Sequence, residues 1–193
     1  MPTARKPARE DPRVARTRTL IEEAFLAVME EKGFEDLTVG DVADRAGINR
    51  VTFYSHFADT HALLAHTVRK AFAAEVEQAG LAGRRLDTSA VRELFTLSCT
   101  YVAGLRTHCR PPHLHLDWIL EQEITAYCAQ LFRTWAPSTQ SPKDATKITF
   151  VATAASAAMY GLVSSWSHMK KPASATAFVA STLPIVTGIL KVE

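Results

Sequence analysis

The sequence predicts an all-α protein: an N-terminal three-helix head followed by a C-terminal helical bundle, with about nine helices in total. Apolar residues recur every three or four positions along most of the chain, and helix caps, glycines or prolines separate the periodic stretches. Neither half shows the alternation typical of strands. With 193 residues and 47% apolar content, the chain can bury a substantial core. We place the domain boundary between residues 1–58 and 59–193.

The first helix of the head is expected from Arg13 to Lys32, where apolar residues recur at helical spacing until Gly33 stops the pattern. Basic residues are concentrated in the first twenty positions, namely Arg5, Lys6, Arg9, Arg13, Arg16 and Arg18, and a basic arm precedes this helix. This arm either contacts phosphate groups or is only a solvated tail. The formal net charge of +2 does not by itself indicate a nucleic-acid partner.

The stretch from Thr38 to Phe57 predicts a helix-turn-helix. Thr38 and Asp41 form a capping box that begins one helix, and Gly47 is suited to end it. Asn49 is a good N-cap for the second helix. We expect Phe25, Val42, Ile48, Phe53 and Phe57 at the centre of the head, with Ile48 as a buried pivot and Tyr54 pointing away from Phe53.

From Arg16 to Phe72 the chain resembles the tetracycline-repressor (TetR) family of bacterial transcription regulators. The motifs that carry the resemblance are Gly-Phe after the first helix, T-V-x-D-V-A-x-x-A-G, and T-F-Y-x-H-F. The resemblance implies that Thr38 and the helix from Asn49 to His56 face DNA. Two residues depart from the family pattern: Val51 replaces a common small residue, and Thr60 replaces a usual phosphate-binding lysine.

The candidate DNA-binding residues divide by expected role. Base-edge contacts are assigned to Asn49, Arg50, Val51 and Thr52, and phosphate contacts to Thr38, Tyr54 and His56. Arg50 is the main specificity candidate because a guanidinium can pair bidentately with guanine. No acidic residue lies between Ala46 and Ala58, so no carboxylate repels phosphate there.

The C-terminal bundle is predicted from further periodic stretches. A helix capped by Asp59 runs to about Gly80 and joins the head to the bundle. The fifth helix begins at Thr88 or Ser89 and ends before Pro111 and Pro112, and a short helix from His113 to Gln122 runs into another. The last two helices span Lys143 to His168 and a stretch that starts at Ser174 or Thr176 and contains Pro184.

The helices of the bundle are expected to enclose an effector pocket, apolar with a few polar groups. Candidates chosen by helical spacing are Phe95, Cys99, Trp118, Tyr127, Phe132, Trp135, Met159 and Tyr160, and many of them can equally be core. The aromatic content favours a hydrophobic or aromatic small molecule. Glu121 or Glu123 would meet a cationic ligand if either pointed inward.

The last two helices are apolar around more of their circumference than a single core requires, which predicts a homodimer. The resemblance implies a four-helix interface between two copies of this helix pair. The alternative is that both helices only complete the monomer core. The run from Ile148 to Trp166 is rich in Ala, Ser and Thr, so we expect no membrane span.

Three cysteines (Cys99, Cys109 and Cys128) without CxxC spacing and an N-terminus without a signal-peptide core favour the cytoplasm. The group of His108, Cys109, His113, His115 and Asp117 has metal-ligand chemistry, but prolines interrupt it, and we expect a polar loop or pocket rim with no metal or cofactor. No phosphate loop, nucleophile elbow or HExxH helix is present, so an enzyme is not expected.

Together these features predict a dimeric, ligand-responsive DNA-binding regulator, a repressor, acting on a near-palindromic double-stranded operator. Two other hypotheses stay open. One is an enzyme built around the His108 to Asp117 group. The other is a helical DNA-organising or interaction protein without an effector.

Overall fold

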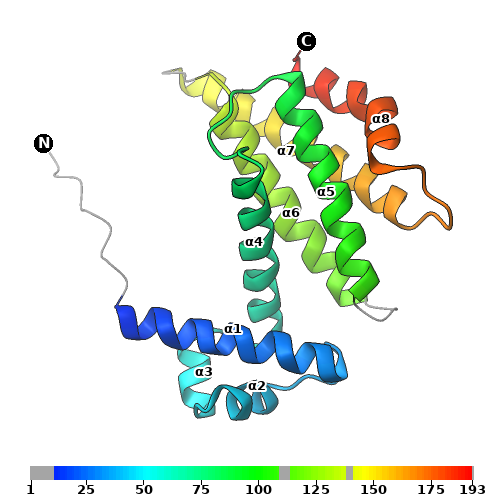
Figure 1. Ribbon diagram of the computed structural model, residues 1–193. Helices are drawn as coiled ribbons and strands as arrows, with labels where there is room; N and C mark the ends of the chain where they lie inside the picture. Colours follow the sequence, from blue (N-terminus) through cyan, green and yellow to red (C-terminus); the bar gives the residue numbers. More distant parts are fainter. Residues whose placement is uncertain (1–10, 109–113, 138–140, 193) are drawn as a thin grey trace, which may run out of the picture. The chain divides into compact units, whose positions relative to one another are not determined.

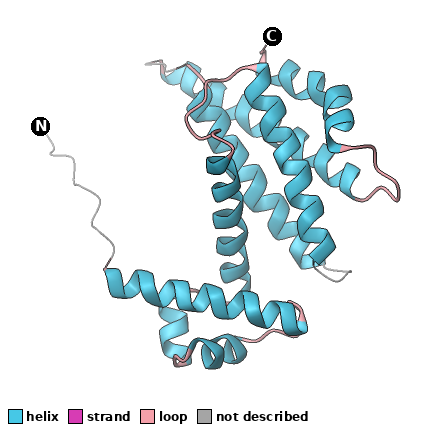
Figure 2. Cartoon of the chain, in the orientation of Figure 1, coloured by secondary structure: helices cyan, strands magenta, loops and turns pink. Residues whose placement is uncertain are grey.

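The computed structural model describes residues 11–108, 114–137 and 141–192, and within them the regular structure is entirely helical (Figures 1 and 2). The basic arm up to Glu10 lies outside the described residues, as do Pro111 and Pro112. The helices are α1 (Pro12–Lys32), α2 (Val39–Ala46), α3 (Arg50–His56), α4 (Thr60–Gln78), α5 (Thr88–His108), α6 (Leu114–Trp135), α7 (Pro142–Ser167) and α8 (Ala175–Leu190).

The chain forms two compact units, Met1–Leu64 and Ala65–Glu193, so the division falls inside α4. In the first unit α1 packs against α2, and α2 against α3. Its core contains four of the five predicted central residues: Phe25, Val42 and Phe53 are fully buried, and Phe57 is buried. The prediction for Ile48 is wrong in degree, because this residue is only half-buried at the turn.

In the second unit α6 packs against α7, while α5 and α7 pack against each other and against α8 (Figure 1). The part of α4 in this unit is attached through bulky side chains. The Tyr101 hydroxyl on α5 donates a hydrogen bond to the Val68 carbonyl (3.1 Å). The Phe72 ring lies 5.1 Å from the ring of Tyr101 and 5.6 Å from that of Tyr127, between ring centroids.

The predicted bundle helices are largely confirmed, with one correction. The sequence predicts a short helix from His113 to Gln122 and then a second one, but the described residues form the single helix α6. No Gly or Pro lies between Leu114 and Trp135 to interrupt it. Asp59 and Ser174 cap α4 and α8, accepting hydrogen bonds from the amides of Ala62 (2.7 Å) and Ala177 (3.2 Å).

Candidate nucleic-acid interface and effector site

The predicted capping box is present at the start of α2. The Thr38 hydroxyl oxygen accepts a hydrogen bond from the Asp41 amide (3.2 Å), and the Thr38 amide donates to the Asp41 carboxylate (2.9 Å). The same carboxylate pairs with Lys32 Nζ at 2.8 Å. The Lys32 ammonium and both Thr38 donors hold the pKa of Asp41 well below its usual range. The start of α2 is therefore fixed to the end of α1.

A second ion pair joins α1 and α2 further along. Arg45 Nη2 lies 2.6 Å from both carboxylate oxygens of Glu31, and this hydrogen-bonded pair lowers the pKa of Glu31. The charges of Glu31 and Asp41 are thus balanced locally.

The turn between α2 and α3 follows the predicted chemistry. Gly47 adopts φ 67° and ψ 33°, the left-handed conformation that glycine adopts without strain. The Ile48 amide then donates to the Ala43 carbonyl at 3.0 Å. At the next helix start, Asn49 Oδ1 accepts a hydrogen bond from the Thr52 amide at 2.7 Å. The two helices therefore have fixed ends on both sides of a three-residue turn.

Helix α3 separates buried from exposed residues as the spacing predicts. Phe53 is fully buried and its ring centroid lies 6.1 Å from that of Phe57. Tyr54 is 56% exposed and Val51 is 79% exposed. Ser55, which the sequence analysis did not single out, is exposed four residues after Val51, a spacing that would have identified it. The helix therefore offers an outward face without any carboxylate.

The other candidate DNA-binding residues have less uniform exposure. Asn49, Arg50 and Thr38 are exposed, whereas Thr52 and His56 are half-buried. The Arg50 guanidinium lies over Gly40 of α2, so closely that a Cβ atom on Gly40 would be 2.6 Å from Arg50 Nη2. The structure thus brings Arg50 to the first turn of α2, next to the capping box.

Six of the eight predicted effector residues are buried in the core of the second unit. Phe95, Cys99 and Met159 are fully buried, and Phe132, Trp135 and Tyr160 nearly so. They pack among themselves and their neighbours: the Phe132 and Trp135 rings are 5.9 Å apart between centroids, and Trp135 Nε1 donates to the Leu81 carbonyl at 3.0 Å.

Two of the predicted effector residues are more accessible. Tyr127 is half-buried against Phe72, and Trp118 is 62% exposed on α6. Helical spacing identified the apolar face of each helix, but it could not tell a packed core residue from one that lines a cavity.

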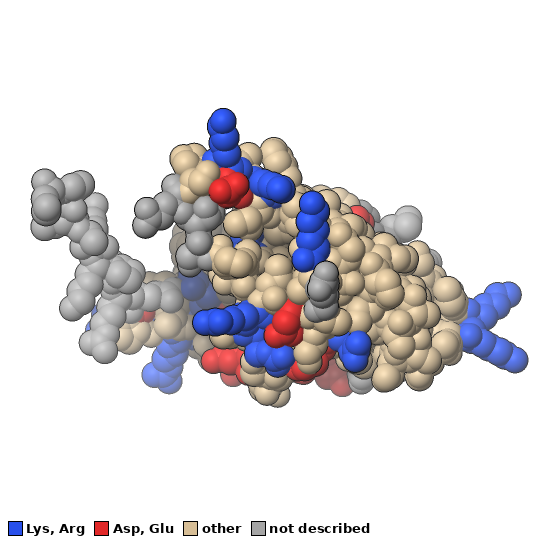
Figure 3. All heavy atoms as spheres, turned by 90° about the horizontal axis from the view of Figure 1, so that it is seen from above, with Lys and Arg blue, Asp and Glu red and all other residues tan. Residues whose placement is uncertain are grey.

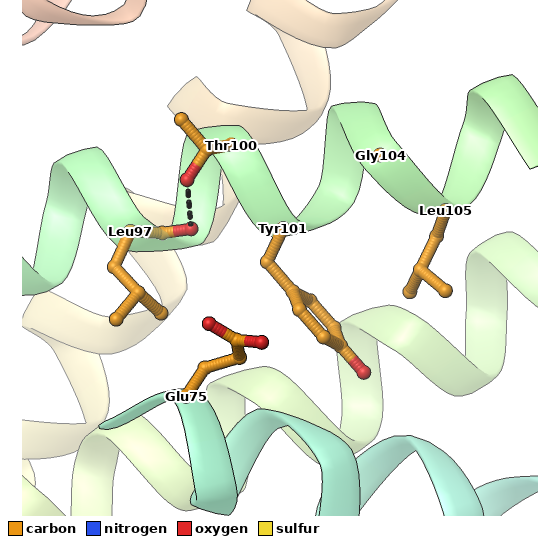
Figure 4. A pocket seen from close by; sticks show the side chains of 6 residues that line it. All are labelled: Glu75, Leu97, Thr100, Tyr101, Gly104 and Leu105. Atoms are coloured by element: carbon orange, nitrogen blue, oxygen red, sulfur yellow. Dashed lines mark hydrogen bonds between the residues drawn. The ribbon is translucent and has the colours of Figure 1, made fainter. Parts of the chain in front are cut away.

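A hollow does occur in the second unit, on the side where α4 faces α5 (Figure 4). Its volume is about 310 Å³, and it is lined by Glu75, Leu97, Thr100, Tyr101, Gly104 and Leu105. None of these residues was a predicted ligand contact. Helical spacing could not have found them, because the hollow depends on how far α4 stands from α5.

Most of the predicted His and Cys group lies outside the described side chains, namely His108, Cys109, His113 and His115. Asp117 is described: it accepts a hydrogen bond from Arg106 Nη2 at 2.6 Å, and its other oxygen lies 3.6 Å from His168 Nε2. The described residues contain no group of three His, Cys, Asp or Glu placed to hold a metal ion.

Helices α7 and α8 present an uncharged surface. From Ile148 to Trp166 α7 has no charged residue, and α8 has none at all. Phe150 is 70% exposed and Ile185 is 52% exposed. Figure 3 shows a broad uncharged area with Lys and Arg side chains at its margins. By length and composition α7 is apolar enough to cross a membrane, yet only 33% of its most apolar window is buried in the chain.

Comparison with known proteins agrees with this architecture. Residues 21–67 match the model of the bacterial regulatory proteins of the tetR family. A stretch of 73 residues is 34% identical to the uncharacterized HTH-type transcriptional regulator YxbF of Bacillus subtilis. That stretch is 37% of this chain and spans only 19% of the relative's length.

Two solved structures resemble nearly the whole chain in fold. The R. erythropolis transcriptional repressor QsdR, of the TetR family, aligns with a TM-score of 0.60 and 14% identity over 93% of this chain and 94% of that one. The transcriptional regulator FadR of Bacillus subtilis, in complex with stearoyl-CoA, aligns with a TM-score of 0.51 and 13% identity over 87% of this chain and 96% of that one.

The fold and the capped helix pair define a DNA-binding protein of the helix-turn-helix class. Residues 21–67, which contain this helix pair, match the tetR family of bacterial regulatory proteins, and this match confirms the resemblance found in the sequence.

Proposed function

We propose that the chain is a dimeric, ligand-responsive transcriptional repressor that releases a near-palindromic operator when a small, largely hydrophobic molecule binds its second unit. It acts in the cytoplasm as a regulator without catalytic activity. The observation that carries this proposal is the outward face of α3, where Val51 and Tyr54 are exposed and no carboxylate is present. A surface of this kind suits the major groove, since a helix enters it and phosphates flank it.

Base contacts are assigned to the first turn of α3. Arg50 reads guanine through its two guanidinium nitrogens, and Val51 makes an apolar contact with a thymine methyl group. Asn49 and Thr52 are the neighbouring candidates, although Asn49 Oδ1 is already used by the Thr52 amide. Thr38, Tyr54 and His56 bind the flanking phosphates and fix the position of the head.

Dimerisation is assigned to α7 and α8, because an exposed uncharged surface of this kind is typical of an interface. Small residues allow close helix approach: Ala154, Ala157 and Gly161 are exposed on α7, and Gly188 is exposed on α8. A two-fold pair of heads would read two half-sites separated by one helical turn or more. The domains proposed for these roles are residues 1–58 for DNA and 59–193 for effector and partner.

The effector hypothesis is supported by the FadR structure, which was solved with stearoyl-CoA. Effector control also has a route along the chain, since α4 begins in the first unit and continues through the second. A ligand that shifts α4 would move the helix pair joined to it. The six buried effector candidates would contact a ligand only if the core that they fill opened around it.

Mapping where the full chain binds across its host genome tests the regulatory role. We expect a small number of strong sites upstream of genes. Binding at very many sites would instead support a DNA-organising protein. Adding a broad panel of hydrophobic compounds to the protein–DNA complex tests effector control, and a panel that never changes DNA affinity would contradict it.

A further inference from the structure

The hollow between α4 and α5 has the dimensions of a small-molecule site. Its volume of about 310 Å³ is at the lower end of ligand pockets and suits a single-ring compound. Leu97 and Leu105 supply apolar walls, and Tyr101 supplies an aromatic one (Figure 4). Space is left beside Gly104, where an added Cβ atom would have no heavy atom within 4 Å.

Glu75 is the one charged residue that lines this hollow. Figure 4 shows its carboxylate directed toward the space between Leu97 and Tyr101. Among the residues that the structure describes, no cation lies within ion-pair distance of Glu75. By contrast, Glu123, one of the two carboxylates predicted to meet a cationic ligand, already lies 3.7 Å from Arg69 Nη1.

Tyr101 can present its ring to a cation while its own hydroxyl stays neutral and hydrogen-bonded. Burial and the nearby negative charge of Glu75 raise the pKa of Tyr101 to about 12, so its phenol is neutral at physiological pH. Its hydroxyl is already committed to the Val68 carbonyl at 3.1 Å. The ring is held next to Phe72 and offers a π-surface that attracts cations.

We propose that this hollow binds a monovalent organic cation with a hydrophobic or aromatic body, for which Glu75 is the counter-charge and Tyr101 the aromatic contact. The inference rests on the proposed ligand-responsive function and names the chemical class of the effector. Because Glu75 belongs to α4, a ligand in the hollow contacts the helix that continues into the first unit. A ligand bound in the hollow would therefore change the affinity of the chain for DNA.

A matched pair of probes isolates the charge: 3-hydroxyphenyltrimethylammonium and 3-tert-butylphenol have nearly the same shape and differ in one positive charge. Calorimetric titration of the full chain should show the cation binding about tenfold more tightly than the neutral probe. Glu75→Gln should reduce this preference severalfold and leave only the part that the Tyr101 ring contributes. Glu77→Gln removes an exposed carboxylate from the same helix that does not line the hollow, and should leave the preference intact.

Gly104→Leu fills the hollow and should weaken binding of both probes, with circular dichroism checking that the helices are retained. Equal affinities of wild type for the two probes would overturn the proposal, as would equal effects of Glu75→Gln and Glu77→Gln. Operator binding without ligand separates the two proposals. If the chain selects specific DNA but does not prefer the cation, only the ligand class is wrong. If it does not select DNA, the proposed function itself fails.

Discussion

The guanidinium of Arg50 lies over the backbone of Gly40, so that a Cβ atom at position 40 would come within 2.6 Å of Arg50 Nη2 and 3.3 Å of its Cζ. The relationship joins the first turn of α3 to the first turn of α2. Arg50, the main specificity candidate, can keep this position only if residue 40 is a glycine, because a Cβ atom there would displace the guanidinium. Gly40 is therefore a positioning residue for Arg50.

Replacing Gly40 by alanine should alter DNA preference without harming the fold. Alanine is the better helix former, so stability should be kept or raised by up to about 1 kcal/mol. The Arg50 guanidinium must then move, so we expect Gly40→Ala to alter the preference at the base pair that Arg50 contacts. At that base pair Arg50→Ala should reduce discrimination by about 1–3 kcal/mol. Fluorescence anisotropy on DNA carrying single base-pair changes measures both effects.

Gly83→Ala is the matched control, since an added Cβ there meets nothing within 4 Å. If Arg50→Ala weakened binding equally on all sequences, Arg50 would be a phosphate contact rather than a base contact.

The capping box predicts a pH dependence for the stability of the head. The folded pKa of Asp41 lies below its ordinary value of 3.8 because Lys32 and Thr38 hold the carboxylate in its charged form. Its stabilisation is then fully present above that ordinary value and is lost as the pH falls through the depressed folded pKa. The difference in melting temperature between wild type and Asp41→Asn should be constant near neutrality and shrink below about pH 4. A difference that grew on acidification would contradict this account.

The uncharged surface predicts that exposed residues control the oligomeric state. Phe150→Arg combined with Ile185→Arg should give a folded monomer, because buried arginines would be left unpaired in an interface. Light scattering after size-exclusion chromatography measures the mass, and circular dichroism checks the fold. Leu26→Arg is the control: Leu26 is 46% exposed on α1, and the change should leave the dimer intact. A monomeric wild type, or unchanged dimers in the double variant, would oppose the assignment. Partition of wild type into lipid vesicles would instead favour a membrane role for α7.

The buried thiols should be inert in the native protein. Burial raises the pKa of Cys99 and of Cys128 to about 12, which leaves almost no thiolate near pH 8. In a Cys109→Ser variant, which removes the third cysteine, a disulfide reagent should label neither thiol until the protein is unfolded. Rapid labelling of the native variant would show that the core around these residues opens.

Local chemistry explains what could be predicted from the sequence. The caps at Thr38 and Asn49 and the left-handed Gly47 depend on residues at most three or four positions apart, and the structure has all three. The division between Phe53 and Tyr54 follows from helical periodicity alone.

Relations between helices could not be read in the same way. The contact of Arg50 with Gly40, the partial exposure of Ile48 and the outward position of Trp118 depend on tertiary packing. The hollow at Glu75 depends on the separation of α4 from α5, to which no local signal corresponds.

Selection of DNA by the full chain from a random-sequence pool tests the central claim most directly. We expect a single enriched, near-palindromic sequence with half-sites one helical turn or more apart, because two copies of α3 must enter successive major grooves. An enriched sequence without two-fold symmetry would contradict the dimeric arrangement. The absence of any enriched sequence would contradict the assignment of the chain as an operator-specific regulator.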